Sequence, residues 1–161
     1  MKNYIKLELA ALGENESFAR SAVAAFALSL NPTLSELSDI KTAVSEAVTN
    51  CIVHAYRHSA QDKIVIECTI EKDALGGVLH VDVTDFGVGI ENVEEALSPF
   101  FTTLSKEERS GMGFTIMQAF MDKLSVHSGA GKGTRVHMEK RIGFDSKKEY
   151  PTAFERESVN A

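Results

Sequence analysis

The chain has 161 residues, of which 43% are hydrophobic and 25% are charged, as is usual for one globular domain. Its net charge of -6 argues against a nucleic-acid backbone as the main partner, because phosphates bind clustered lysines and arginines. Cys51 and Cys68 lie in apolar segments and predict buried free thiols, and no apolar run reaches the ~20 residues that span a bilayer, so we expect a cytoplasmic protein.

The first third of the sequence predicts one strand and two helices. Apolar residues alternate over 4–9, which is typical of a short strand. They then recur at helical spacing over 18–30 and stop before Pro32. Thr33 and Glu36 form a capping-box pattern, which predicts a second helix that starts there and runs through Ala55.

The rest of the sequence predicts a sheet interrupted by one long loop and one helix. The expected elements are strands over 63–70 and 78–84 around a turn at Gly76 and Gly77, a short helix over 91–97, a loop over 99–110, a helix over 112–124, and strands near 124–127 and 134–140. Because this order lacks regular βαβ alternation, we predict an α/β fold: a two-layer sandwich with helices on one face of a mixed, largely antiparallel sheet. Residues 143–161 are polar and predict a disordered tail.

Glu46, Asn50 and His54 recur every four residues on the predicted second helix and therefore share one stripe. A carboxylate beside an amide can hold a hydrated Mg²⁺ and orient a hydroxyl group. A solvated helix face is the alternative interpretation of the same spacing. His54 and His58 fit a surface pair better than a zinc site, because no third ligand stands at zinc spacing.

A glycine-rich turn follows the predicted strand over 78–84. Gly87 and Gly89 let the backbone turn sharply and approach a flat ligand, while Asp85 offers an acceptor at the end of the strand. An ordinary β-turn explains the same residues.

A second glycine pair, Gly111 and Gly113, opens the predicted helix over 112–124. Amides at a helix N-terminus that are free of side chains form an anion site, and Arg109 just upstream offers a guanidinium for a phosphate oxygen. The alternative is a flexible hinge before the helix.

The joint order of these motifs is more specific than any one of them. A Glu-x-x-x-Asn helix, an Asp-x-Gly-x-Gly turn, a loop and a Gly-x-Gly helix start resemble the nucleotide pocket of the superfamily of gyrase, heat-shock chaperones, histidine kinases and mismatch-repair ATPases. Within it, segments 15–20, 44–50 and 108–117 resemble the sporulation anti-sigma factor F family, over about residues 1–142. The resemblance implies a Bergerat-type ATP-binding fold, ATP and Mg²⁺ as cofactors, and serine kinase activity.

The resemblance also implies roles for individual residues. Asn50 would coordinate Mg²⁺, and Glu46 would act as the general base on the incoming serine hydroxyl. Asp85 would accept the adenine amino proton with help from Thr134, and Arg109 would meet the γ-phosphate. The other nucleotide contacts would come from the glycine turn, the lid over 101–110 and the phosphate cradle, namely Gly87, Gly89, Thr102, Thr103, Ser110, Gly111, Met112 and Gly113.

Partners follow from the same resemblance. Glu16 and Arg20 match the surface on which a sigma factor and an anti-anti-sigma substrate compete, although a helix-stabilising ion pair also explains their spacing. The family further implies a homodimer that keeps its sigma factor from RNA polymerase core and binds neither nucleic acid nor membrane. The alternatives are the related kinase of the general stress sigma factor and a nucleotide-dependent binding module without kinase activity. Ala55 departs from the family, which often has Gly there.

Overall fold

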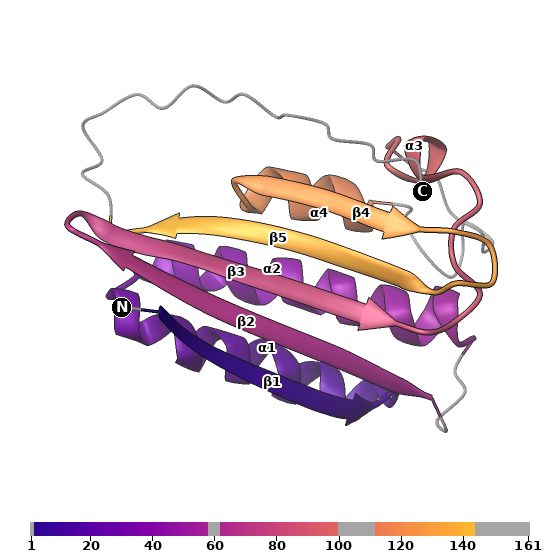
Figure 1. Cartoon of the computed structure of the whole chain (residues 1–161), viewed down its shortest axis with the longest axis horizontal. Helices are drawn as coiled ribbons and strands as arrows, with labels where there is room; N and C mark the ends of the chain where they lie inside the picture. The colour runs from indigo at the N-terminus through magenta and orange to yellow at the C-terminus, as the bar shows by residue number, and fades with distance from the viewer. Residues whose placement is uncertain (1, 58–61, 100–111, 144–161) are drawn as a thin grey trace.

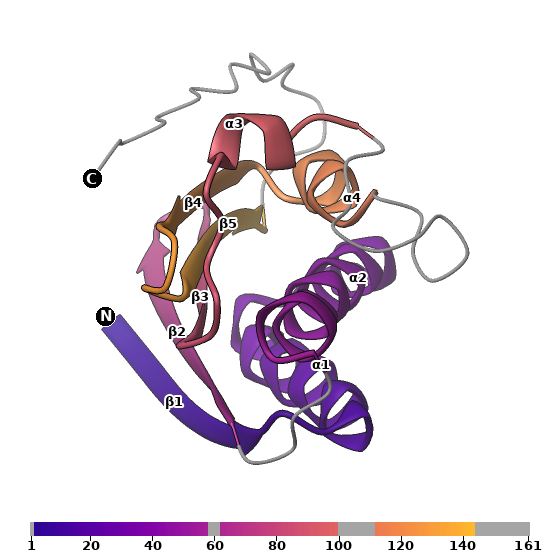
Figure 2. The ribbon, with the colours of Figure 1, turned by 90° about the vertical axis from the view of Figure 1, so that its right-hand side faces the viewer.

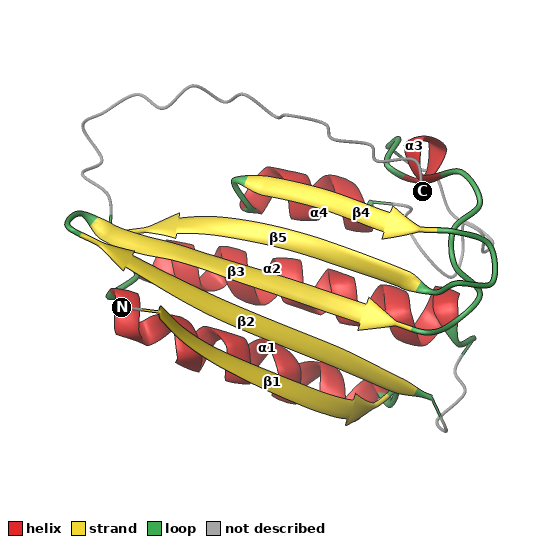
Figure 3. Ribbon diagram, in the orientation of Figure 1, coloured by secondary structure: helices red, strands yellow, loops and turns green. Residues whose placement is uncertain are grey.

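The computed structural model describes residues 2–57, 62–99 and 112–143. In this part of the chain, five strands form one sheet in the order β1-β2-β3-β5-β4, and all four pairings are antiparallel (Figures 1 and 3). The strands are β1 (Lys2–Ala10), β2 (Lys63–Asp73), β3 (Gly76–Asp85), β4 (Lys123–Ser128) and β5 (Thr134–Ile142).

The helices form a second layer on one side of this sheet, as Figure 2 shows for α1, α2 and α4. The helical elements are α1 (Gly13–Ala27), a 3₁₀ turn η1 (Leu28–Leu30), α2 (Leu34–Asn50), a π-helical turn η2 (Cys51–Ala55), α3 (Val93–Ala96) and α4 (Gly113–Phe120). The predicted two-layer α/β sandwich with helices on one face of the sheet is therefore confirmed, and the described sheet is antiparallel throughout rather than mixed. None of the described helices is both long and apolar enough to cross a membrane.

The two faces of the sheet differ because side chains alternate along each strand. On β3, Leu79, Val81 and Val83 are fully buried against the helices, whereas His80 and Asp82 on the other face are half-buried. This pattern is typical of an antiparallel sheet with one covered face. A residue's place in the alternation thus decides whether it can reach the space between the layers.

The start of α2 follows the predicted capping box. The Thr33 hydroxyl accepts a hydrogen bond from the Glu36 amide at 3.2 Å, and the Glu36 carboxylate accepts one from the Thr33 amide at 2.7 Å. The end of α2 differs from the prediction, because the α-helix stops at Asn50 and continues as the π-helical turn. Tyr56 closes that turn by donating its amide to Cys51 at 3.1 Å.

Other boundaries also differ from the predictions, and two of them have a clear cause or position. Helix α4 ends at Phe120 rather than near Leu124, because the Asp122 amide already donates to the Glu139 carbonyl of β5 at 2.8 Å. The hairpin between β2 and β3 turns before Gly76 and Gly77, which are the first residues of β3. Apart from Gly143, the predicted tail over 143–161 lies outside the described residues.

Candidate functional site

A cavity of about 980 Å³ lies where α2, α4 and the ends of β3 and β5 meet. Its volume is at the upper end of the range for small-molecule sites. Five of the predicted nucleotide contacts line it: Asn50, Asp85, Gly89, Gly113 and Thr134. Elements far apart in the sequence therefore bring most of the described motif residues to one place.

Asp85 is the polar end of the buried face of β3. It continues the alternating series that fills the core, so its side chain points between the layers and is 5% exposed. Its Oδ1 accepts hydrogen bonds from the Gly87 amide at 3.0 Å and the Thr134 amide at 3.2 Å. Thr134 is also its cross-strand partner on β5. Both bonds use the same carboxylate oxygen, so neither occupies Oδ2.

The environment of Asp85 shifts two pKa values. Burial raises the pKa of the Asp85 carboxyl above its ordinary value, although the amides of Gly87 and Thr134 and the thiol of Cys51 partly offset this effect. Burial and then the nearby Asp85 carboxylate raise the pKa of the Cys51 thiol well above its ordinary value. Cys51 is thus a protonated thiol in the core, and both cysteines are buried and free, as predicted.

The glycine turn after β3 packs directly on the π-helical turn. A Cβ at Gly87 would collide with the carbonyl oxygen of Ala55, and the Val88 amide donates to that same oxygen at 3.3 Å. Gly89 has a φ of +72°, which a residue with a side chain rarely adopts. The turn therefore needs glycine for close backbone approach as well as for its conformation.

Glu46 and Asn50 meet the first residue of α4. A Cβ placed on Gly113 would lie 3.2 Å from both Glu46 Oε2 and Asn50 Oδ1. The carboxylate of Glu46 and the amide group of Asn50 thus face the N-terminus of a helix whose first residue carries no side chain. His54, predicted on the same stripe, belongs to the π-helical turn and lines the cavity.

The remaining predicted nucleotide contacts divide into two groups. Met112 is described and immediately precedes α4. The other contacts lie outside the described residues, as does the whole predicted lid over 101–110. These contacts are Thr102, Thr103, Arg109, Ser110 and Gly111.

Glu16 and Arg20 lie on α1 as an i, i+4 ion pair, with 3.6 Å between Arg20 Nη1 and Glu16 Oε1. Glu16 also accepts a hydrogen bond from the hydroxyl of Ser45 on α2. The Glu16 side chain is consequently only 19% exposed, whereas that of Arg20 is 42% exposed. Glu16 links two helices, and Arg20 is the more accessible member of the pair.

Tyr56 was not singled out from the sequence, and its hydroxyl holds two segments next to the cavity together. Its hydroxyl donates to the Lys63 carbonyl at 2.7 Å and accepts from the Phe86 amide at 2.6 Å. It therefore ties the start of β2 to the turn after Asp85. The only local signal was an aromatic residue at the end of the predicted helix.

The fold and the cavity agree with the class that sequence comparison defines. Residues 9–140 match the model of the histidine kinase-like ATPase domain family. Such an ATPase domain implies nucleotide binding. A solved structure, that of the RsbU and RsbW domains of Rv1364c from Mycobacterium tuberculosis, has the same fold, with a TM-score of 0.54 and 18% identity over 87% of this chain and 32% of that chain.

Curated relatives define the family more narrowly. The protein named anti-sigma F factor in Thermoanaerobacter sp. (strain X514) is 54% identical to this chain, over 89% of this chain and 96% of the relative. The protein of that name in Caldanaerobacter subterraneus subsp. tengcongensis is 55% identical, over 88% of this chain and 95% of the relative. The Bacillus licheniformis protein of that name is 49% identical over 88% and 94%. The chain therefore belongs to the anti-sigma F factor family of histidine kinase-like ATPase domains, and the predicted resemblance is confirmed.

Proposed function

We propose that this chain is an ATP- and Mg²⁺-dependent serine kinase that phosphorylates an anti-anti-sigma protein. With nucleotide bound, it sequesters the sporulation sigma factor F and blocks its association with RNA polymerase core. Residues 1–142 form the kinase and anti-sigma domain, which acts as a homodimer. The observation that carries the proposal is the convergence of Glu46 and Asn50 on Gly113, beside the cavity that holds the buried Asp85.

The buried end of the cavity suits an adenine ring. Asp85 presents an acceptor there, and its hydrogen bonds to Gly87 and Thr134 fix the carboxylate without using Oδ2. An exocyclic amino group is the donor that such an oxygen accepts. Gly87 and Gly89 keep side chains out of the turn beside this oxygen, and Thr134 lies opposite it.

The other end suits phosphates. The N-terminus of α4 offers backbone amides to an anion, and Gly113 leaves room for close approach. We assign Met112, Ser110 and Gly111 to the same cradle, Thr102 and Thr103 to the lid, and Arg109 to the γ-phosphate.

Asn50 is the residue that we assign to Mg²⁺. Mg²⁺ takes few protein ligands, prefers oxygen and shares the phosphates, so one amide oxygen at the phosphate end of the cavity fits it. When bound, the ion neutralises charge that develops on the phosphates. The Asn50 amide group, with Oδ1 and Nδ2 almost equally near, faces the start of α4, where those phosphates would lie.

Glu46 is the residue that we assign to proton removal from the substrate serine. Its Oε2 faces Gly113 as the Asn50 amide does, so a hydroxyl aligned with the terminal phosphate would lie within its reach. A carboxylate in that position holds the serine proton during transfer. We assign Glu16 and Arg20 on α1 to the surface that the sigma factor and the anti-anti-sigma protein share.

The test is phosphoserine formation from radiolabelled Mg-ATP on an anti-anti-sigma protein. We expect Glu46→Gln to lower the transfer rate by about 10²–10⁴-fold while ATP affinity stays unchanged, because the amide keeps the shape of the side chain but not its basicity. Glu36→Gln is the matched control on α2, since glutamine also completes a capping box.

Phosphoryl transfer by Glu46→Gln at the wild-type rate would show that Glu46 is not the general base. A wild-type protein that captures a sigma factor but forms no phosphoserine would support the alternative of a nucleotide-dependent binding module.

A further inference from the structure

Four side chains that bind protons or metals meet on the open face of the sheet, away from the helices. Two of them alternate on β3, His80 and Asp82, and two on β5, His137 and Glu139. The strand register places His80 opposite Glu139 and Asp82 opposite His137. Because side chains two residues apart share a face, all four lie together, and each histidine has a carboxylate opposite it.

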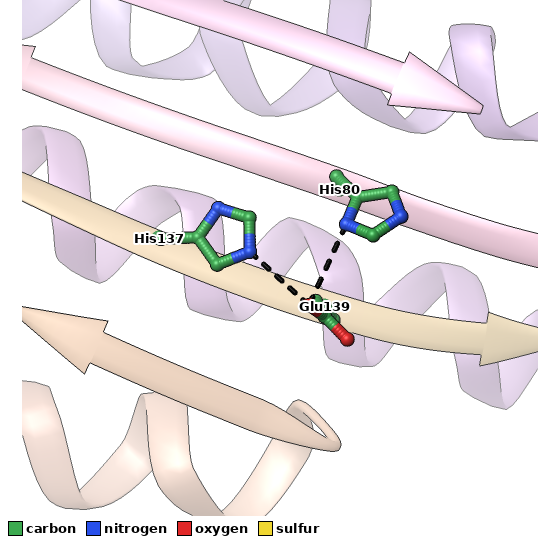
Figure 4. A group of neighbouring side chains, drawn as sticks. All are labelled: His80, His137 and Glu139. Carbon is green, nitrogen blue, oxygen red and sulfur yellow. Dashed lines mark hydrogen bonds and ion pairs between the residues drawn. The ribbon is translucent and has the colours of Figure 1, made fainter. Parts of the chain in front are cut away.

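Three potential ligand atoms converge within this group. His137 Nε2 lies 3.3 Å and His80 Nδ1 lies 3.6 Å from Glu139 Oε1, as the dashed lines in Figure 4 mark. The three ligand atoms all lie within 4.8 Å of one another. Ligands at about 2.0–2.1 Å from a tetrahedral zinc ion are separated by roughly 3.3 Å, so two of the three separations already suit one ion.

A hydrogen-bonded outer neighbour favours metal binding by His137, and a carboxylate beyond hydrogen-bond distance lies on the corresponding side of His80. Asp82 Oδ1 lies 3.0 Å from Nδ1 of His137, and Glu71 Oε2 lies 3.9 Å from Nε2 of His80. A carboxylate hydrogen-bonded to one ring nitrogen favours the tautomer with the proton on that nitrogen. The other nitrogen then keeps its lone pair and can bind a metal ion. On each ring that other nitrogen is the one that faces Glu139 Oε1.

The second oxygen of Glu139 and the orientation of Asp82 are also fixed. Lys123 Nζ lies 3.4 Å from Glu139 Oε2, which leaves Oε1 on the histidine side. The Arg135 Nε donates to Asp82 Oδ1 at 2.8 Å. When both imidazoles direct a lone pair at Glu139 Oε1, the three acceptor atoms repel one another, and a metal ion placed between them removes that repulsion.

We propose that His80, His137 and Glu139 bind one Zn²⁺, with Asp82 as the positioning residue for His137 and the fourth coordination position open to water. Two imidazoles and one carboxylate suit zinc, whereas magnesium and calcium prefer oxygen ligands alone. The site lies on the opposite face of the sheet from Asp85 and Thr134, so it is separate from the proposed nucleotide pocket. A bound ion would join β3 to β5 and stabilise the folded chain.

Calorimetric titration of untagged, nucleotide-free protein with Zn²⁺ tests this site. Zn²⁺ binds the deprotonated imidazole, so protons compete with the metal and mildly alkaline buffer is the right choice. We expect one Zn²⁺ per chain and a higher melting temperature with Zn²⁺ than without it.

Variants separate this site from other zinc ligands. His80→Gln and His137→Gln should abolish binding, and Asp82→Asn should weaken it by about 10–100-fold, as the loss of an outer-shell partner typically does. His127→Gln on β4 is the matched control, because this histidine is exposed and lies outside the group. Melting without zinc checks that each variant folds.

A second measurement reports the ligands directly. Co²⁺ in a tetrahedral site gives intense visible bands, which His137→Gln should remove and His127→Gln should keep. Absence of Zn²⁺ binding by the wild type, or equal affinity in His137→Gln and His127→Gln, would overturn the proposal and leave the group as a protonated ion-pair network.

Discussion

At the scale of single residues, Asp85 shows how a local pattern places a carboxylate in the core, where we propose that it accepts the adenine amino group. The alternation that buries Leu79, Val81 and Val83 continues for one more step, and that step places a carboxylate on the core side. A buried carboxylate is unfavourable unless hydrogen bonds support it, and two backbone amides do so here. The packing of the core does not require this carboxylate, which is consistent with the ligand contact that we propose for it.

Asp85→Asn should weaken ATP binding by roughly tenfold to a hundredfold while the protein stays folded. The amide oxygen can keep both hydrogen bonds to Gly87 and Thr134, because both use one oxygen. The amide nitrogen then takes the place of Oδ2 and presents a donor to the amino group of adenine, so a hydrogen bond to a charged acceptor is lost. Calorimetric titration with Mg-ATP measures the effect, and unchanged affinity would contradict the adenine assignment.

We also predict that Asp85→Asn changes how the stability of the nucleotide-free protein depends on pH. The pKa of Asp85 is raised above the ordinary 3.8, so between 3.8 and the folded-state pKa the folded chain binds more protons than the unfolded chain. Wild-type stability is therefore lost as pH rises through this window, and Asp85→Asn escapes that loss. The melting temperature of Asp85→Asn minus that of the wild type should therefore be larger at neutral pH than in acid.

At the scale of elements, α1 and α2 are joined by the hydrogen bond from Ser45 to Glu16. Arg20 takes part in the same group but remains partly exposed. An exposed i, i+4 ion pair is worth only about 0.2–0.5 kcal/mol. Loss of an arginine from the centre of an interface costs about 2 kcal/mol or more. The two interpretations of Arg20 therefore predict different free-energy losses on its removal. The ion-pair interpretation predicts a small loss of stability, and the interface interpretation predicts a larger loss of partner binding.

Arg20→Ala should weaken binding of the proposed sigma factor by at least about tenfold while ATP affinity and melting temperature stay nearly unchanged. Lys41→Ala, which removes an exposed positive charge from α2, is the matched control. Surface-immobilised binding at constant ATP concentration measures both variants. Equal dissociation constants for Arg20→Ala and the wild type would move the partner surface elsewhere.

The elements also show which boundaries a sequence can predict. The start of α2 was predictable because Thr33 and Glu36 satisfy each other within one turn. The change to a π-helical turn after Asn50 had no local signal, and Tyr56 at the end of that turn bonds to Phe86, which is 30 residues away. The start of this helix thus follows from a local signal, whereas its end lies among tertiary contacts.

At the scale of the whole molecule, the two sites that we propose lie on opposite faces of one sheet. The face under the helices leads to the cavity, and the opposite face carries the proposed zinc ligands. The cavity residues were predictable because glycines and a carboxylate after a strand are unusual in themselves. The zinc ligands were missed because His80 and His137 meet only through the register of β3 and β5, which no short segment encodes.

The assignment of the cavity to Mg-ATP underlies the kinase and the anti-sigma proposals alike. Asn50 decides it most directly, since it is the one protein oxygen that we assign to the metal ion. Asn3→Ala, which removes an exposed amide from β1, is the matched control.

Calorimetric titration with Mg-ATP should show one nucleotide bound per chain for the wild type and for Asn3→Ala, and no measurable binding for Asn50→Ala, whose melting temperature without nucleotide should match that of the wild type. Failure of the wild type to bind Mg-ATP, or binding by Asn50→Ala with wild-type affinity, would contradict the assignment.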